Sequence, residues 1–250
     1  MLYIVKDVFS SVASNYDTMN DLMSLGIHRL WKDRFVRSID AGAKSEEQEP
    51  WTVLDIAGGT GDIALRILDH ATQVNHDSQL RVTISDINPE MLAEGRKRCS
   101  NTGYAVTNRL SFLEANAEDL SMIPSDSVDL YTVAFGIRNF TNKQRALEEA
   151  YRVLKPGGVF ACLEFSKVSN SLFDAVYKRW SFGAIPLIGQ LVAGDRDSYQ
   201  YLVESIERFP APKDFAAMIS KAGFTLPLGQ EWENLSGGIA AIHKGIKVTR

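Results

Sequence analysis

The chain has 250 residues, of which 45% are hydrophobic, and a formal net charge of −4. This length and composition suit one domain with a single sizeable core. The acidic balance gives no general attraction to nucleic acid, so we expect no nucleic-acid partner. The sequence has no run of about 18 apolar residues, and its first residues lack signal-peptide and presequence patterns, so we expect no membrane span and no targeting segment in it.

The first and second segments of the chain differ in pattern. Residues 1–40 carry apolar side chains at spacings near a helical period, which predicts an N-terminal helical cap. Residues 41–50 (AGAKSEEQEP) lack apolar periodicity and indicate an exposed linker.

The two cysteines of the chain, Cys99 and Cys162, fall in a predicted helix and a predicted buried strand. Free buried thiols are therefore favoured over a disulfide or a metal site.

From residue 51 short apolar runs alternate with helical patterns, which is typical of an α/β fold with a mostly parallel sheet and helices on both faces. Strands are predicted at 51–57, 80–87, 109–115, 127–135 and 158–165, with helices at 62–71, 89–99 and 143–154. The glycines of Leu154-Lys155-Pro156-Gly157-Gly158 predict a helix end and a tight turn. Beyond the core, a longer stretch at 170–208 is rich in aromatic residues, and after it a helix is predicted at 211–224 and a closing pair of strands at 224–232 and 238–248.

The most informative short motif is Asp55-Ile56-Ala57-Gly58-Gly59-Thr60-Gly61-Asp62, where a strand ends and a helix begins. Glycines there let a ligand approach the backbone, and a helix N-terminus offers N–H groups to it. The glycine spacing is not the G-x-G-x-x-G of dinucleotide enzymes, which disfavours a pyrophosphate ligand. A plain strand-to-helix turn is the structural alternative.

Asp86 ends the second predicted strand, where a carboxylate can accept hydrogen bonds from both ribose hydroxyls of an adenosine cofactor. The alternative is that Asp86 and Asn88 only cap the helix that follows. Arg138 and Asn139 end the fourth strand, at the sheet edge where ligands of open α/β folds bind.

Long motifs beyond the glycine loop carry a resemblance to a known family. They are Tyr16–Lys32, Arg152–Gly158 with Leu163–Ser166, the segment Phe135–Asn139, and the segments 197–202 and 234–238. On them the chain resembles the ubiquinone and menaquinone biosynthesis C-methyltransferases, a class I family that depends on S-adenosylmethionine (SAM). The resemblance covers nearly the whole chain. The linker at 41–50 and the loop at 70–79 are longer than in compact bacterial members, which favours a mitochondrial member.

The resemblance implies a Rossmann-like methyltransferase domain over residues 1–250, with a helical cap at 1–40, a SAM-binding core at 51–166, a substrate-covering helical insertion at 167–210 and a closing helix and strands at 211–250. It implies that SAM is the cofactor and that the third-strand segment reads the adenine ring. The expected cofactor-binding residues are Asp55, Gly58, Gly59, Thr60, Gly61, Asp86, Asn88, Asn116, Ala117 and Glu118.

The implied reaction is C-methylation of a polyprenylated benzoquinol, 2-methoxy-6-polyprenyl-1,4-benzoquinol, in ubiquinone biosynthesis. A ring carbon is a poor nucleophile unless a ring hydroxyl loses or shares its proton, so the protein must position the ring and handle one proton. Arg138, Asn139 and Tyr16 are the expected catalytic residues. Arg138 either stabilises phenolate charge or braces the loop through a carboxylate, and both readings stay open. His28 and Trp31 are expected to be packing residues, and no metal is expected.

The prenyl tail requires an apolar groove, for which the aromatic residues of 172–202 are candidates, although they suit an internal core cover equally well. The resemblance further implies a peripheral protein on the matrix face of the mitochondrial inner membrane, other quinone-biosynthesis enzymes as partners and a possible homodimer. A bacterial cytoplasmic location is the alternative. Three other functions stay open: a methyltransferase for another small metabolite, a nicotinamide oxidoreductase, which the glycine spacing disfavours, and a non-catalytic scaffold subunit.

Overall fold

The computed structural model describes Ser24 and residues 26–43, 49–168 and 196–248, with side chains from residue 200 onward in the last range. Its strands are β1 (Thr52–Ile56), β2 (Arg81–Asp86), β3 (Leu110–Glu114), β4 (Val128–Ala134), β5 (Leu154–Phe165), β6 (Trp232–Leu235) and β7 (Ala240–Ile246). Its helices are α3 (His28–Ile39), α4 (Asp62–Gln73), α5 (Pro89–Cys99), α6 (Gly103–Val106), α7 (Lys143–Val153), α10 (Arg196–Arg208) and α11 (Pro212–Lys221), with 3-10 turns η1 (Ile137–Asn139) and η3 (Ser236–Gly238).

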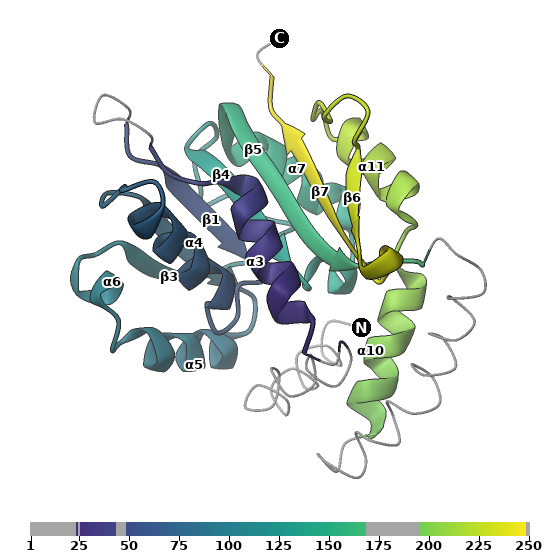
Figure 1. Ribbon diagram of the computed structural model, residues 1–250, viewed down its shortest axis with the longest axis horizontal. Coiled ribbons are helices and arrows are strands. Elements are labelled where there is room, and N and C mark those ends of the chain that lie inside the picture. Colours follow the sequence, from purple (N-terminus) through teal and green to yellow (C-terminus); the bar gives the residue numbers. More distant parts are fainter. Residues whose placement is uncertain (1–23, 25, 44–48, 169–195, 249–250) are drawn as a thin grey trace.

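The strands form a single sheet in the order β3-β2-β1-β4-β5-β7-β6. β1 to β5 are parallel, and β7 pairs antiparallel with both β5 and β6. The apolar runs make this arrangement favourable, because strands buried on both faces need side chains that avoid water on each side. The sequence-based prediction of a mostly parallel sheet of seven strands with helices on both faces is confirmed (Figure 1).

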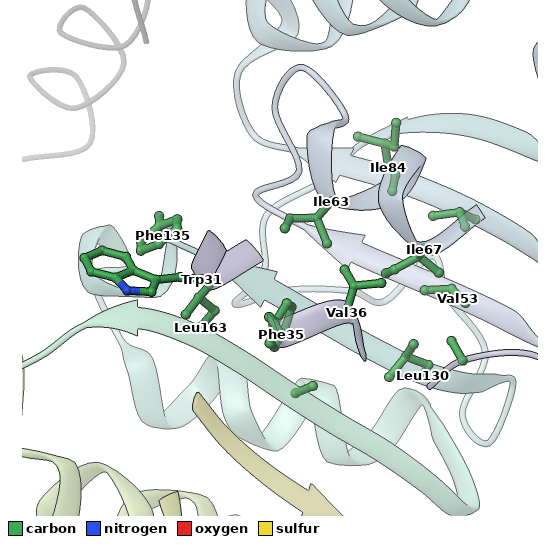
Figure 2. Close-up of a cluster of buried hydrophobic side chains, with 14 of the residues drawn as sticks. Trp31, Phe35, Val36, Val53, Ile63, Ile67, Ile84, Leu130, Phe135 and Leu163 are labelled. Atoms are coloured by element: carbon green, nitrogen blue, oxygen red, sulfur yellow. The ribbon is translucent and has the colours of Figure 1, made fainter. Parts of the chain in front are cut away.

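One face of the sheet is covered by α3, α4, α5 and α10 (Figure 1). Val36 of α3 lies beside Ile67 of α4, whereas Trp31 of α3 lies beside Phe135 (Figure 2). Of the predicted cap at 1–40, the structure describes Ser24 and the part from residue 26, and α3 lies on the sheet there. As predicted, His28 and Trp31 are packing residues, since both are buried.

The opposite face is covered by α7 and α11. Apolar residues of α7, including Leu147 and Val153, join Phe215 and Ile219 of α11 in a second buried cluster. Each helix repeats its apolar residues at helical spacing, so one stripe of the helix meets the sheet and the other faces solvent. The two predicted free cysteines are confirmed, one on each face: Cys99 is in the first cluster and Cys162 in the second.

The predicted strand at 224–232 is wrong. Within that run Thr225 pairs as an isolated bridge to Ile246, and Trp232, its last residue, pairs with His243 as the first residue of β6. Pro227 lacks an N–H donor, and a turn follows in which the Gln230 N–H donates to the Pro227 carbonyl at 3.3 Å. Phe224 is buried but Leu228 is fully exposed, so the apolar residues after Pro227 do not continue a buried strand face.

Two further predictions are corrected in detail. The turn predicted at 154–158 is an irregularity inside β5, where the register against β4 shifts and Gly157 adopts a φ of 83°. The linker predicted at 41–50 begins buried rather than exposed, because Ala41 is fully buried and Asp77 Oδ2 accepts from the Ala43 N–H at 2.8 Å. Residues 44–48 lie outside the described part. None of the described helices is long and apolar enough to cross a membrane.

Candidate active site

A cavity of about 630 Å³ opens at the carboxyl ends of β1, β2, β3 and β4. This is the edge at which open α/β sheets bind their ligands, and the volume falls within the range of about 300–1,000 Å³ that ligand pockets occupy. All ten predicted cofactor residues except Gly61 line it, as do Arg138 and Asn139. The sheet thus brings to one place side chains that are up to 84 positions apart (Asp55 and Asn139).

The glycine loop joins β1 to α4 through a tight turn. The Gly58 N–H donates to the Ser85 carbonyl of β2 at 3.0 Å, and the Gly61 N–H donates to the Gly58 carbonyl at 2.8 Å. Gly59 and Gly61 have φ angles of 52° and 84°, which glycine adopts without strain. A Cβ on Gly58 would lie 2.9 Å from Asp55 Oδ2, so the loop sits directly on the Asp55 side chain. Side chains larger than hydrogen are excluded by this packing.

Asp55 supports the loop from below. Its Oδ1 accepts a hydrogen bond from Thr132 Oγ1 at 2.7 Å, whereas its buried Oδ2 has no partner among the described residues. Burial raises the pKa of Asp55 to about 7, against the lowering effect of the Thr132 hydrogen bond. A buried carboxylate oxygen that lines the cavity without a partner fits a cofactor with a cationic or hydrogen-bonding group.

Asp86 and Asn88 end β2 and begin α5. Asp86 accepts from the Gly59 N–H at 3.0 Å through Oδ2 and from the Asn88 N–H at 2.9 Å through Oδ1. Asn88 Oδ1 accepts from the Glu90 and Met91 N–H groups, so Asn88 is the helix cap. Asp86 is thus not needed as the cap. It ties the glycine loop to the end of β2, and burial raises its pKa.

The segment after β3 forms a short turn along the cavity. Asn116 Oδ1 accepts from the Glu118 N–H at 3.0 Å, which fixes the turn. Glu118 Oε1 accepts from the Thr141 and Asn142 N–H groups at 2.7 and 3.0 Å, so it joins this turn to the segment that precedes α7. Ala117 is buried between them. The three predicted adenine-side residues therefore lie together on one wall.

Arg138 lies in the cavity wall after β4, with its side chain only 1% exposed. Its Nη1 pairs with Glu164 Oε1 of β5 at 2.8 Å and also donates to the Phe135 carbonyl. Its Nε donates to Ser205 Oγ of α10 at 3.3 Å. The ion pair with Glu164 agrees with the interpretation of Arg138 as a brace for the loop. The place of Arg138 in the cavity wall agrees equally with a role in stabilising charge on the substrate. The catalytic role of Arg138 stays a prediction.

Asn139 lines the cavity and contacts Tyr201 of α10. The Tyr201 hydroxyl donates to Asn139 Oδ1 at 3.3 Å, and the Arg208 guanidinium lies 5.9 Å from the centre of the Tyr201 ring. Burial raises the pKa of Tyr201, against the cations Arg138 and Arg208. Burial lowers the pKa of Lys143, which also lines this part. Tyr16, the third predicted catalytic residue, lies outside the described residues.

Sequence reasoning missed several lining residues. Lys32 of α3 and Asp62 of α4 form an ion pair of 2.8 Å at the cavity, and Tyr201 and Ser205 come from α10. Asp62 closes the glycine motif and Lys32 closes the long motif at 16–32, so both were present in the patterns. Their pairing was not readable, because spacing along the chain does not show which helices meet.

Strained backbone marks the same edge of the sheet. Ala57 and Phe135 follow β1 and β4 directly, and both have positive φ angles, 52° and 55°. Such angles cost a non-glycine residue about 1–2 kcal/mol and tend to persist where function or packing requires them. A Cβ on Gly136 would lie 2.5 Å from Ala57 Cβ, so the two loops touch at this point. The cavity floor is therefore built from two strand ends in direct contact.

Comparison with known proteins gives the family. A model of the ubiE/COQ5 methyltransferase family matches residues 2–247. The chain is 57% identical over 246 residues to the Schizosaccharomyces pombe protein named 2-methoxy-6-polyprenyl-1,4-benzoquinol methylase, mitochondrial, with 98% of this chain and 80% of the relative covered. It is 53% identical over 245 residues to a Brucella abortus ubiquinone/menaquinone biosynthesis C-methyltransferase, with 98% of this chain and 86% of the relative covered.

The fold is also that of solved methyltransferases. A SAM-dependent methyltransferase from Aquifex aeolicus superposes with a TM-score of 0.62 at 15% identity, covering 92% of this chain and 97% of the other. At that identity the match speaks for the fold alone. Together with the family match and the lining of the cavity, it leads to one conclusion: the chain belongs to the ubiE/COQ5 methyltransferase family and is an enzyme whose methyl donor is S-adenosyl-L-methionine.

Proposed function

We propose that this enzyme methylates a ring carbon of 2-methoxy-6-polyprenyl-1,4-benzoquinol in ubiquinone biosynthesis. The observation that carries the proposal is a single cavity with two differently built parts. One part is the glycine loop with Asp86, suited to an adenosine cofactor, and the other is the Asn139, Tyr201 and Arg138 wall, suited to a hydroxylated ring. The relative named for this activity shares 57% of its aligned residues with the chain.

The cofactor part is assigned residue by residue. Asp86 would accept from the ribose hydroxyls, the backbone of Gly58, Gly59 and Thr60 would lie against the chain of the cofactor, and the turn at 116–118 would contact the adenine ring. Bound SAM supplies a methyl group on a sulfonium sulfur, which makes that methyl electrophilic. The cationic sulfonium also fits a cavity that contains the carboxylates of Asp55, Asp62 and Asp86.

The acceptor part must raise the nucleophilicity of a ring carbon. We assign Asn139 and the Tyr201 hydroxyl, which share a hydrogen bond, to hold a ring oxygen. Arg138 stabilises the negative charge that develops on that oxygen as its proton passes to water, because a fixed cation in a partly dry site acts more strongly than one in water. As the ring carbon bonds to the methyl group, the methyl–sulfur bond breaks to leave S-adenosylhomocysteine, and the hydrogen on that carbon is lost as a proton, which restores the aromatic ring. Glu164 keeps the guanidinium in place. Tyr16 is retained as a third catalytic candidate from the cap.

The remaining assignments concern the tail and the surroundings of the enzyme. We assign residues 167–210 to covering the acceptor, and aromatic side chains from 172–202 to the prenyl tail; residues 169–195 lie outside the described part. Such a tail favours peripheral contact with a membrane. The mitochondrial relative supports the matrix face of the inner membrane, and the bacterial relative keeps a bacterial cytoplasm as the alternative. Other quinone-biosynthesis enzymes and a second copy of the chain are the proposed protein partners.

A direct assay tests the proposal. The purified chain is incubated with methyl-labelled SAM and a short-chain 2-methoxy-6-prenyl-1,4-benzoquinol under reducing conditions, and the product is analysed by mass spectrometry. We expect a product heavier by one methyl group on a ring carbon, and no reaction with the oxidised quinone. Methyl transfer to a phenolic oxygen, or none to any quinol, would refute the proposed acceptor. The latter result combined with SAM binding would favour a scaffold role.

A further inference from the structure

Lys32 and Asp62 lie at the cavity beside the glycine loop. Lys32 has no role in the assignments above, and Asp62 has entered them only as one of three carboxylates in the cavity. Lys32 Nζ and Asp62 Oδ2 are 2.8 Å apart, and the Lys32 side chain is only 5% exposed. Both residues line the cavity, although Lys32 belongs to α3 and Asp62 to α4. Burial of a lysine ammonium is costly, so its place in a ligand cavity needs an explanation.

Asp62 does not depend on Lys32 alone. Its Oδ1 accepts from Arg66 Nε at 3.1 Å and from Arg98 Nη2 at 3.4 Å, and neither arginine lines the cavity. Burial opposes the charge of Asp62, but Lys32, Arg66 and Arg98 outweigh it and lower its pKa. Two cations therefore hold Asp62 from outside the cavity. Lys32 is the cation on the cavity side.

The order of groups along the loop relates this ion pair to the cofactor. Asp86 contacts the loop at Gly59, and Asp62 follows Gly59 by three positions. A cofactor whose ribose lies at Asp86 and whose chain follows the loop therefore brings its far end to Lys32 and Asp62. In SAM this far end is an amino acid, with a negative carboxylate and a positive ammonium. The hydrogen bond to Asp62 uses one of three N–H donors of the Lys32 ammonium, which leaves donors for a carboxylate.

We propose that Lys32 binds the α-carboxylate of the methyl donor, while Asp62 attracts the adjacent α-ammonium. The inference rests on the proposed cofactor part of the site and assigns its amino-acid end. A helix of the N-terminal part thereby contacts the cofactor directly, so occupancy of the site stabilises the packing of α3 against α4. A purely structural ion pair would hold α3 whether or not the ligand carries a carboxylate.

The test compares SAM with decarboxylated S-adenosylmethionine, which lacks only the α-carboxylate, by calorimetric titration of the full chain. A charge-assisted hydrogen bond of ordinary strength corresponds to a change in Kd on the order of 10- to 100-fold. We expect the wild type to prefer SAM by this factor and Lys32→Met to lose the preference through weaker SAM binding. Affinity of Lys32→Met for the decarboxylated compound should stay within about threefold of wild type. Lys32→Arg should retain most of the preference.

Arg66→Met is the matched control. It removes another cation from Asp62 without touching the cavity, so we expect the preference for SAM to remain. If Lys32→Met retains the wild-type preference, or loses affinity for both ligands equally, the inference is refuted. Should that variant not fold, NMR of the lysine ammonium groups in the wild-type protein tests the same contact: the Lys32 signal must shift more with SAM than with the decarboxylated compound, and equal shifts would refute the inference. A wild type that binds neither ligand would refute the proposed cofactor site instead.

Discussion

Two carboxylates beneath the glycine loop differ in how their oxygens are used. Both oxygens of Asp86 accept backbone N–H groups, so the carboxylate is held firmly at the end of β2. Asp55 uses one oxygen for Thr132 and leaves the other without a described partner. Asp86 is therefore oriented as a fixed acceptor, whereas Asp55 is a buried charge that needs a partner from elsewhere or a proton.

Asp86→Ala tests the ribose assignment. The change removes a charged acceptor, and charged hydrogen bonds contribute about 1.5–3 kcal/mol, so the SAM dissociation constant should rise on the order of 10- to 100-fold. Calorimetric titration measures it. Because Asp86 also ties Gly59 to β2, Asp86→Asn serves as the control for this contact: its single amide oxygen can still accept from the Gly59 N–H, although the Asn88 N–H then loses its acceptor, and circular dichroism should still show a folded protein. An unchanged SAM affinity in Asp86→Ala would leave the carboxylate a structural role only.

Arg138→Lys separates the two interpretations of that residue. Lysine keeps the positive charge but loses the planar fork that joins Glu164, Phe135 and Ser205. If Arg138 stabilises charge on the quinol oxygen, kcat should fall on the order of 10²–10³-fold with little change in SAM affinity. If it only braces the loop, melting temperature and SAM affinity should fall together, while turnover at saturating ligands remains. Single-turnover methyl transfer and thermal melting on one preparation distinguish these results.

At the scale of elements, the site depends on contact between loops that follow different strands. Gly136 follows β4 and packs on Ala57, which follows β1. Glu118 joins the turn after β3 to the start of α7 through two backbone hydrogen bonds. Since these contacts lie between strand ends, the width of the cavity is set by the register of parallel strands and not by any single loop.

Gly136→Ala should open this contact. Gly136 has a φ of −120°, so alanine is tolerated by the backbone, but its Cβ would lie 2.5 Å from Ala57 Cβ. The two loops must separate, at a cost of about 1–3 kcal/mol in stability, and SAM affinity should fall with it. Chemical denaturation and calorimetric titration measure both. Gly103→Ala is the control, because no atom lies within 4 Å of its added Cβ; equal effects of the two changes would contradict the argument.

At the scale of the whole molecule, two buried groups on different strands give stability opposite dependences on pH. Burial raises the pKa of Asp55 to about 7, so stability falls as pH rises from the unfolded value near 4 to about 7. Burial lowers the pKa of His243 to about 4, despite its hydrogen bond to the Pro212 carbonyl. Stability from this group is therefore lost as pH falls from about 6.5 to 4.

The two contributions are separable by mutation. Relative to wild type, Asp55→Asn should become progressively more stable as pH rises from 4 to 7, by a few kcal/mol in total, and then level off. His243→Gln should gain relative stability as pH falls through the same range. Urea denaturation of the unliganded proteins at several pH values measures both differences. Since the residues are on β1 and β7, their effects should add in the double variant. Differences that do not vary with pH would contradict the assignments.

The sequence by itself determined the alternation of strands and helices, the sheet class and the glycine loop with Asp86. These features are local: apolar periodicity shows which face of each element avoids water, and glycines mark where the backbone must turn tightly. The same local reasoning misplaced the strand predicted at 224–232, because Pro227 and the turn after it interrupt that run. It could not rank the two roles of Arg138 either.

Tertiary structure alone decided which distant side chains meet. Lys32 with Asp62, Arg138 with Glu164 and Tyr201 with Asn139 are pairs from different elements, and hydrophobic burial brings those elements together. Position in space also determines the two pKa shifts: burial raises the pKa of Asp55 to about 7, whereas the neighbouring cations Lys32, Arg66 and Arg98 lower the pKa of Asp62 against the effect of burial. Spacing along the chain shows neither these side-chain pairs nor these pKa shifts, because both arise only when the helices have packed on the sheet.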